Sequence, residues 1–573
     1  MRFFWLLAVL CCAQANALDR EAFTITRYDL NATVDPTQQR LAVRGKITLR
    51  NDSDVLQKNI ALQISSSLNW ISIQLNAKPV EFFSQTYTSD IDHTGALSEA
   101  ILTPSGPVAS KQTIELQIAY EGVIPQDTTR LTRIGVPVET ARHSDWDEIG
   151  RNFTAVRGIG YVAWYPVATE AANLSDGDSV PTTVGRWKQR EAGTEMKVNL
   201  CTSGTAGVMN DSHTGVPGAS FSAAIGQSSL GCVLYSFLRL DETVPIFVVG
   251  QFSKIERDDV LIHYLFEHKS GADDYALALN QSAPPVTQWF GDHGAKQNAR
   301  PELFDLPDPQ DAPFESGNFL LMPLSGNDTS LLLSAVRQLA HAAFASPRLW
   351  ISQGLASWAQ AAYMQNEKGR EAAVAYLQGH RQALIAAEKD NLAKASDLAA
   401  AHSLINDPDE LYVETKAMNV WWMLRDMVGE TAFTAALRSY HASDDKNAYY
   451  MQKLLEAQAH RDLEWFFDDW VYRDRGLPDF HIVSVYPRQL LEGGYMVTVT
   501  VENLGAAAAE VPVTLHMTQG ESTERLTVPG KSKASIRIAA PMLPQEATVN
   551  DGSVPEINPN NNRYQIPASS GSN

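Results

Sequence analysis

The residues of this chain that come nearest to a known catalytic pattern are Arg337–His341, which read RQLAH. In the pattern His-Glu-x-x-His, two histidines four residues apart project from one face of a helix onto zinc, and the glutamate between them acts as general base. Here only the second histidine, His341, is kept. Arg337 takes the place of the first histidine, and Gln338 takes the place of the glutamate.

These replacements remove most of the chemistry of the pattern. A guanidinium stays protonated, offers no lone pair and repels a dication, so Arg337 opposes metal binding. The amide of Gln338 cannot accept a proton from water. Two roles remain open for His341. It is either a metal ligand or a hydrogen-bonded residue of the core or cleft, and the second is the commoner role of a lone histidine. For Arg337, capture of a ligand carboxylate and an ion pair within the domain remain open.

Length and composition indicate an ordinary globular protein of several domains. The chain has 573 residues, of which 44% are apolar and 20% are charged, and this length predicts two to four domains. The formal net charge of -20 argues against nucleic acid and anionic membranes as partners.

The first residues predict export from the cytoplasm. An early arginine, an apolar stretch from Phe3 to Cys12 and small residues at Ala15 and Ala17 are typical of a cleavable secretory signal, residues 1–17. A lipid anchor on Cys11 or Cys12 is the weaker alternative. No other apolar run reaches the ~20 residues that span a bilayer, so we expect no transmembrane segment and a secreted, periplasmic or extracellular protein.

Two cysteines remain after the signal peptide, Cys201 and Cys232. An even pair in an oxidising compartment favours a disulfide, which would stabilise the fold by about 3 to 4 kcal/mol on the chain-entropy model. Two buried, reduced cysteines are the alternative.

Hydrophobic periodicity divides the rest of the chain into three parts. Residues 18–255 show short alternating segments such as RYDLNATVD and TIELQIAYEG, which predict a β-rich domain. Residues 256–477 are mostly helical in pattern, for example LLLSAVRQLAHAAF and AMNVWWMLRDMV, after strand-like VLIHYLF and FLLMPL. Alternation returns in residues 478–567, which predict a small immunoglobulin-like β-sandwich, and residues 568–573 predict a disordered tail.

In this order the segments resemble the aminopeptidase N family of gluzincin zinc metallopeptidases. The resemblance covers most of the chain and depends on YDLNATVD, YVAWYPV, PIFVVGQF, KAMNVWWMLRDMVGETAFTAALRSYH and FFDDWVYRDRGLPDF, in addition to the altered zinc segment. It implies a β-rich N-terminal domain before a mostly α-helical, thermolysin-like peptidase domain.

The resemblance also implies positions for the site residues, and most of them are altered. Gln353 stands where the family has the third zinc ligand, a glutamate, and the loop between it and His341 is shorter than in the family. Glu414 stands where the family has the tyrosine that stabilises the tetrahedral intermediate. Tyr412 lies two residues away, and since residues i and i+2 of a helix face different directions, it cannot simply take that place. Glu315 is the nearest stand-in for the glutamate that binds the substrate amine.

We therefore expect a secreted relative of the aminopeptidases that has lost catalysis and works in peptide or protein binding, with no cofactor, although active relatives carry zinc. The positions Arg337 and Glu414 are predicted to form an ion pair. One alternative is an active zinc aminopeptidase with an atypical ligand set built from His341, Glu315 and Glu414. The other alternative is an envelope interaction protein that binds through its C-terminal sandwich.

Overall fold

The computed structural model describes residues 18–176, 179–202, 232–237, 240, 243–291, 300–325, 328–394 and 403–567. These residues form two compact units, which divide between Gly250 and Gln251, except that Val184–Arg186 group with the second unit. The predicted signal peptide, 1–17, and the predicted tail, 568–573, lie outside the described residues. None of the helices described here is long and apolar enough to cross a membrane.

The described part of the first unit is rich in β-structure, as the sequence predicts. A seven-stranded sheet has the order β12-β11-β1-β2-β8-β4-β5, and alternate residues of its strands are buried. Its strands are β1 (Phe23–Asp35), β2 (Arg40–Asn51), β4 (Leu68–Leu75), β5 (Lys78–Pro79), β8 (Thr113–Val123), β11 (Glu195–Thr202) and β12 (Cys232–Phe237). Two smaller sheets and three helices complete this unit: β3 (Ile60–Ser65), β6 (Phe82–Thr88), β7 (Ala96–Leu102), β9 (Glu148–Ile149), β10 (Thr154–Val156), β13 (Phe247–Val249), α1 (Thr129–Arg133), α2 (Val138–Ser144) and α3 (Ser179–Arg190).

The predicted disulfide joins two neighbouring strands of this sheet. β11 and β12 run antiparallel, and their register places Cys201 directly opposite Cys232. The two sulfur atoms are bonded, with 4.0 Å between the Cα atoms. The disulfide prediction is therefore confirmed.

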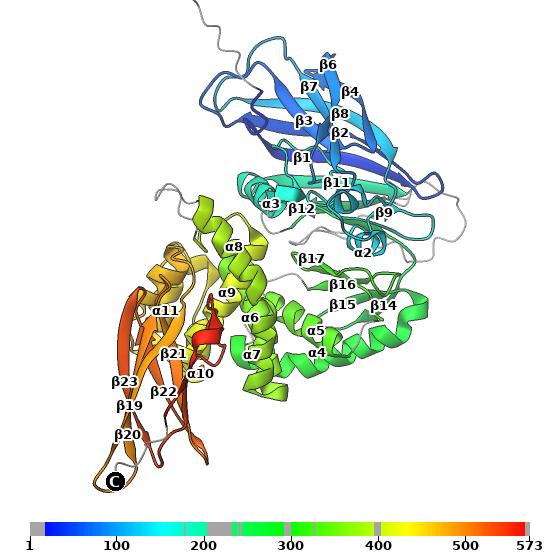
Figure 1. Cartoon of the computed structure of the whole chain (residues 1–573). Helices are drawn as coiled ribbons and strands as arrows, with labels where there is room; N and C mark the ends of the chain where they lie inside the picture. The colour runs from blue at the N-terminus through cyan, green and yellow to red at the C-terminus, as the bar shows by residue number, and fades with distance from the viewer. Residues whose placement is uncertain are drawn as a thin grey trace, which may run out of the picture. The chain divides into compact units, whose positions relative to one another are not determined.

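The second unit begins with a five-stranded sheet in the order β14-β15-β16-β18-β17. The strands are β14 (Ser253–Glu256), β15 (Leu261–Tyr264), β16 (Glu302–Asp305), β17 (Phe314–Ser316) and β18 (Phe319–Met322), and the edge strand β17 runs antiparallel to β18. Helices α4 (Lys269–Phe290) and α5 (Asp328–Ala343) lie on one side of this sheet (Figure 1). β17 and α5 each supply residues to the candidate site.

Most of the residues that follow are helical, again as predicted. The helices are α6 (Leu349–Lys368), α7 (Arg370–Gly379), α8 (Arg381–Lys394), α9 (Glu410–Val428), α10 (Glu430–Arg438), α11 (Tyr450–Ala459) and α12 (Glu464–Phe467), which continues into a π-helical turn, Asp468–Tyr472. Their tryptophans are core residues: Trp350 of α6 and Trp421 of α9 are buried and stack with ring centroids 5.0 Å apart. This contact holds α6 against α9.

The crossing of α6 and α9 depends on a small residue, Gly354. A Cβ atom at this position would lie 2.5 Å from the Cβ of Ala417 and 2.9 Å from the ring of Trp421, both on α9. Any larger side chain would push the two helices apart. Because Gln353 and Ser357 flank this contact on α6, the close approach brings them near Glu414 of α9.

The C-terminal residues form two antiparallel sheets. One sheet has the order β19-β20-β23 and the other has the order β22-β21-β24-β25. The strands are β19 (Phe480–Gln489), β20 (Tyr495–Asn503), β21 (Ala509–His516), β22 (Glu521–Val528), β23 (Ser532–Ala540), β24 (Glu546–Val549) and β25 (Arg563–Gln565). Strands were predicted in this part of the chain, and their presence is confirmed.

The C-terminal sheets belong to the same compact unit as the helices. The indole of Trp470 is buried and donates to the carbonyl of Ala508 at 2.7 Å, and the amide of Ala508 donates to Asp469 at 2.8 Å. Removing all residues after Arg475 would therefore expose this tryptophan. The predicted boundaries at 255/256 and 477/478 stay predictions.

Glu556, in the C-terminal part, predicts a pH-dependent term in stability. It is 2% exposed, and burial raises the pKa of its carboxyl from 4.5 to about 7, although Asn562 and Asn550 donate to it. The folded protein therefore binds this proton more tightly than the unfolded chain. The resulting stabilisation is complete below pH 4.5 and is lost as the pH rises through about 7.

In Glu556→Gln we expect this loss of stability to be absent. In the wild type it lowers the free energy of unfolding by at most about 1.4 kcal/mol per pH unit. Urea unfolding at several pH values between 4.5 and 7.5 measures it. Glu510→Gln is the matched control. Arg461 and Arg525 outweigh burial and lower the pKa of Glu510, so the stability change due to its titration occurs at lower pH. Equal slopes for wild type and Glu556→Gln would contradict the expectation.

Candidate functional site

Arg337 of α5 is the centre of the candidate site. Its Nε donates to Glu315 at 2.5 Å, and one terminal nitrogen donates to Glu414 at 2.7 Å. The same nitrogen donates to the hydroxyl of Ser357 at 2.6 Å, and the other donates to the amide oxygen of Gln353 at 2.9 Å. The predicted pair of Arg337 and Glu414 is therefore confirmed. Glu315 and Gln353 were predicted to lie near this cleft, and both accept from the same guanidinium.

Four different elements position these side chains. Glu315 comes from the edge strand β17, Arg337 from α5, Gln353 and Ser357 from α6, and Glu414 from α9. The buried face of α5 is formed by residues such as Val336 and Ala340, so the adjacent position 337 is turned toward the helices that follow.

Burial and charge act in opposite directions on the groups at this site. Burial alone would lower the pKa of Arg337, but Glu414 and Glu315 outweigh it and raise that pKa above its ordinary value. Burial alone would raise the pKa of Glu315, but His341 and Arg337 outweigh it and lower that pKa. The guanidinium and the Glu315 carboxylate therefore stay charged across the physiological range.

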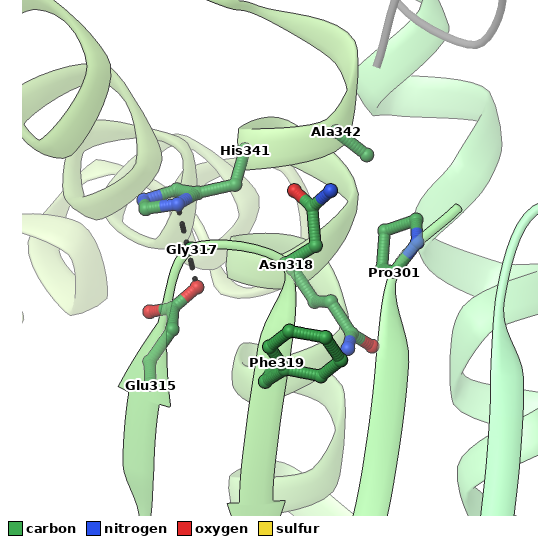
Figure 2. A pocket seen from close by; sticks show the side chains of 8 residues that line it. Pro301, Glu315, Gly317, Asn318, Phe319, His341 and Ala342 are labelled. Carbon is green, nitrogen blue, oxygen red and sulfur yellow. Dashed lines mark ion pairs between the residues drawn. The ribbon is translucent and has the colours of Figure 1, made fainter. Parts of the chain in front are cut away.

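His341 lies one helical turn after Arg337, on the same side of α5. Its Nδ1 is 3.4 Å from the carboxylate of Glu315, and both side chains line a small pocket together with Asn318 and Phe319 (Figure 2). Burial, as the largest cause, lowers the pKa of His341. The imidazole is therefore neutral at neutral pH, and Arg337 is the cation of this site.

Gln338 is held by the core. It is 3% exposed, and its amide oxygen accepts from the hydroxyl of Tyr275 at 2.8 Å. Its amide nitrogen lies 3.5 Å from the carbonyl of Glu302. The amide thus has partners on α4 and β16, which gives it a structural role whatever else it does.

Tyr412 points away from Arg337. Its hydroxyl donates to Asp474 and accepts from the ammonium of Lys416 at 2.9 Å. Glu414, two residues later on α9, faces Arg337 instead. The two positions thus face different directions, as predicted from their spacing.

A cavity of about 230 Å³ lies next to Arg337 and Glu414. The other residues of its wall were not predicted as site residues from the sequence: Ser357, Gln360, Tyr376, His380, Thr415 and Met418. Gln360 lies one turn after Ser357 on α6, so its place on the same helix face is a signal that was available. Tyr376 and His380 are also one turn apart, on α7 and at its end, but no spacing relates them to α5 or α9.

Comparison with known families matches residues 347–470 to the peptidase family M1 domain. The chain contains a peptidase family M1 domain. The matched residues include Gln353 and Glu414, and the match begins after His341. The resemblance predicted from sequence is confirmed at the level of this family.

Solved structures similar to this chain include three of an M1 zinc metallopeptidase from Deinococcus radiodurans. The first has 16% identity and a TM-score of 0.44, and it covers 77% of this chain and 92% of the other. A point mutant has 17% identity and a TM-score of 0.45, with coverages of 81% and 97%. The same mutant bound to a Tyr-Ser-Ala substrate has 17% identity, a TM-score of 0.44 and the same coverages. No curated protein matches the chain by sequence.

The donors at Arg337 do not fit the zinc ion of an active M1 peptidase. Of the three ligand positions, Arg337 has no lone pair, Gln353 offers a neutral amide oxygen that already accepts from Arg337, and His341 alone is a good zinc donor. The carboxylates of Glu315 and Glu414 are bound to the guanidinium. Within the described residues, no group of three or more histidine, cysteine, aspartate or glutamate side chains arranged to share an ion includes any of these positions.

Proposed function

We propose that this M1 protein binds peptides or proteins without cleaving them and that Arg337 replaces the zinc ion of its relatives. The observation that carries the proposal is the simultaneous ion pairing of Arg337 with Glu315 and Glu414. A permanent cation then holds together the strand and helices around the cleft, as a bound metal ion would. It cannot take the catalytic role of a metal ion, because a guanidinium binds no water as a ligand and generates no hydroxide.

The other groups of the site support the same conclusion. Hydrolysis of an amide needs a base for the attacking water and a donor for the oxyanion that forms. Gln338 is neutral and is hydrogen-bonded in the core. Glu414 presents a carboxylate, which would repel an oxyanion. The residues present therefore favour retention of a bound peptide over its hydrolysis.

The proposal extends to the setting and architecture of the protein. We infer that residues 1–17 direct it out of the cytoplasm, where the Cys201–Cys232 disulfide can form. We also propose that the helical part has a thermolysin-like arrangement and that the two C-terminal sheets form an immunoglobulin-like sandwich. Binding through these sheets is tested by substitutions on their exposed faces, because truncation would uncover Trp470.

Hydrolysis of alanine anilide and of a mixture of short peptides tests the proposal. The wild-type protein, purified without chelator and equilibrated with zinc, is expected to show no turnover above a protein-free blank. Mass spectrometry of the peptide mixture extends the test to other amino-terminal residues. Zinc-dependent turnover that disappears in His341→Ala would instead establish the alternative, an active enzyme with an atypical ligand set.

A further inference from the structure

One end of the two C-terminal sheets carries exposed apolar side chains. The chain turns from β19 into β20 at residues 490–494, and the loop from β23 to β24, residues 541–545, lies at the same end, because Tyr495 of β20 pairs with Ala540 of β23. Three exposed apolar residues of these two loops form what we call the tip: Leu490, Leu491 and Met542.

The tip points away from the helices of the second unit. Trp470, which follows α12, donates to the carbonyl of Ala508 just before β21 begins, at the opposite end of the sheets. β21 ends at His516, and this end is the one with the tip, because the amide of Gln545 donates to the carbonyl of His516 at 2.8 Å. Figure 1 shows the same end of the sheets at the bottom of the view, away from the helices. Leu491 is fully exposed there.

The loops at this end are almost free of charge. Residues 490–494 read LLEGG, residues 517–520 read MTQG and residues 541–545 read PMLPQ, so Glu492 is the single charged residue among them. Exposed apolar side chains gathered in one place indicate a site where a partner displaces water. A protruding tip suits a partner that is fluid, because a rigid protein surface would need a pocket of matching shape.

Two arginines and a tyrosine lie directly behind the tip, on one face of the β19-β20-β23 sheet. Thr498 of β20 pairs with Tyr486 on one side and with Arg537 on the other, so these side chains project from the same face. Arg488 follows Tyr486 by two residues and projects from that face too. Both arginines and the tyrosine are exposed, and neither guanidinium has a hydrogen-bond or ion-pair partner among the residues described here.

The order of these groups matches the layers of a bilayer surface. At about 3.4 Å per residue, Arg488 lies within about 10 Å of Leu491, and Tyr486 lies about 7 Å farther back. Apolar groups of interfacial proteins sink about 5 to 10 Å into the boundary of headgroups and acyl chains. Arginine and tyrosine then keep their apolar parts near the lipid and their polar ends at the headgroups.

We propose that this end of the C-terminal sheets docks on a zwitterionic lipid bilayer, with the tip at the acyl boundary and with Arg488 and Arg537 on lipid phosphates. The net charge of -20 opposes an anionic surface, which limits the inference to zwitterionic lipid. Near the tip the charges are favourable, since two arginines outweigh Glu492 and charges more than about 8 Å away are largely screened at physiological salt.

Docking of this kind is reversible, because three side chains bury less apolar surface than a lipid anchor does. It goes beyond the proposed function and does not depend on it, since Arg337 and its partners take no part. It would hold the protein at a membrane surface without any transmembrane segment.

Co-sedimentation of the purified protein with phosphatidylcholine vesicles tests the proposal. We expect saturable binding at millimolar lipid. The double variant Leu490→Ser, Leu491→Ser should weaken it about tenfold or more, because each leucine loses several buried carbon atoms. Replacing Arg488 and Arg537 with glutamine should weaken it severalfold. No binding by the wild type, or equal binding by the wild type and the double leucine variant, would overturn the proposal.

Leu504→Ser is the matched control for the leucine substitutions. Leu504 is also exposed, but it follows β20 at the end of the sheets opposite the tip. We expect its replacement to leave vesicle binding unchanged. Urea unfolding of each variant shows that the fold is kept, and a loss of binding in Leu504→Ser equal to that in the double variant would overturn the assignment to the tip.

A fluorescent label shows whether the tip enters the lipid. Since Cys201 and Cys232 form a disulfide, an environment-sensitive dye attaches only to an introduced cysteine. With vesicles, dye on Glu492→Cys should shift to shorter wavelength, and dye on Leu504→Cys should not shift. Absence of a shift at position 492 would overturn insertion.

Sedimentation velocity without lipid tests a second copy of the chain as the occupant of the tip. We expect a sedimentation coefficient that does not depend on protein concentration. A dimer that the double leucine variant dissociates, in a protein that does not bind vesicles, would assign the tip to a contact between copies and overturn the lipid proposal.

Discussion

Replacing Arg337 with methionine is expected to lower the free energy of unfolding by about 3 to 5 kcal/mol. The guanidinium pairs with Glu315 at 2.5 Å and with Glu414 at 2.7 Å, and these carboxylate side chains are only 17% and 32% exposed. Methionine keeps most of the volume of arginine but none of its donors. Two partly buried carboxylates would then lose their common partner. Leaving these charges unpaired costs more free energy than the intact ion pairs contribute relative to apolar groups of similar size. Urea unfolding followed by circular dichroism measures the change.

The triple variant Arg337→Met, Glu315→Gln, Glu414→Gln separates charge from packing. Since it removes the unpaired charges together with the cation, most of the lost stability should return. Arg337→Met with wild-type stability would show that the ion pairs do not hold the site together. A triple variant as unstable as the single one would assign the loss to packing instead of charge.

Replacing Lys416 with methionine is expected to destabilise the second unit by a similar amount, about 3 to 5 kcal/mol. Lys416 of α9 is 1% exposed, and its Nζ lies 2.8 Å from Glu388 and 2.6 Å from Asp474, which are themselves 4% and 6% exposed. Burial would lower the pKa of Lys416, but these two carboxylates outweigh it and raise that pKa. Without the ammonium, Glu388 of α8 and Asp474 after the π-helical turn would be two buried carboxyl groups without their common cation.

Thermal and urea unfolding of Lys416→Met check this expectation. Lys453→Met on α11 is the matched control, because Lys453 is exposed and an exposed lysine contributes little, within about 0.5 kcal/mol. Adding Glu388→Gln should recover part of the stability, since it leaves one buried carboxylate in place of two. A loss no larger than that of the control would contradict the role given to this cluster.

Much of the fold could be predicted because its periodicity is local. Alternating apolar residues identified β1, β2 and β8 in the first unit and β19 to β23 near the C-terminus, and the Ala- and Leu-rich pattern identified α5, α6 and α9. Helix α4 is different, since it continues through Pro284 and Pro285. Proline removes a backbone donor and argues against a helix, but buried side chains such as Trp289 hold α4 in the core. Tertiary packing therefore overrides the local signal there.

Part of the candidate site could also be predicted from the sequence. Arg337, Gln353 and Glu414 could be placed from a family pattern, and the shortened loop after α5 still lets Gln353 reach Arg337 at 2.9 Å. Tyr376 and His380 could not be placed, because α7 approaches α9 only in the folded chain. Ser357 was also missed, because a serine on a helix carries no signal until the carboxylate opposite it is known.

Zinc content, measured by mass spectrometry on protein purified without chelator and then titrated with zinc, tests most directly whether Arg337 has replaced the metal. We expect far less than one zinc per chain, no saturable binding at micromolar zinc, and no change on replacing His341 with alanine. Near one zinc per chain, lost in His341→Ala, would show that the site assembles a metal centre despite Arg337 and would contradict the proposed function.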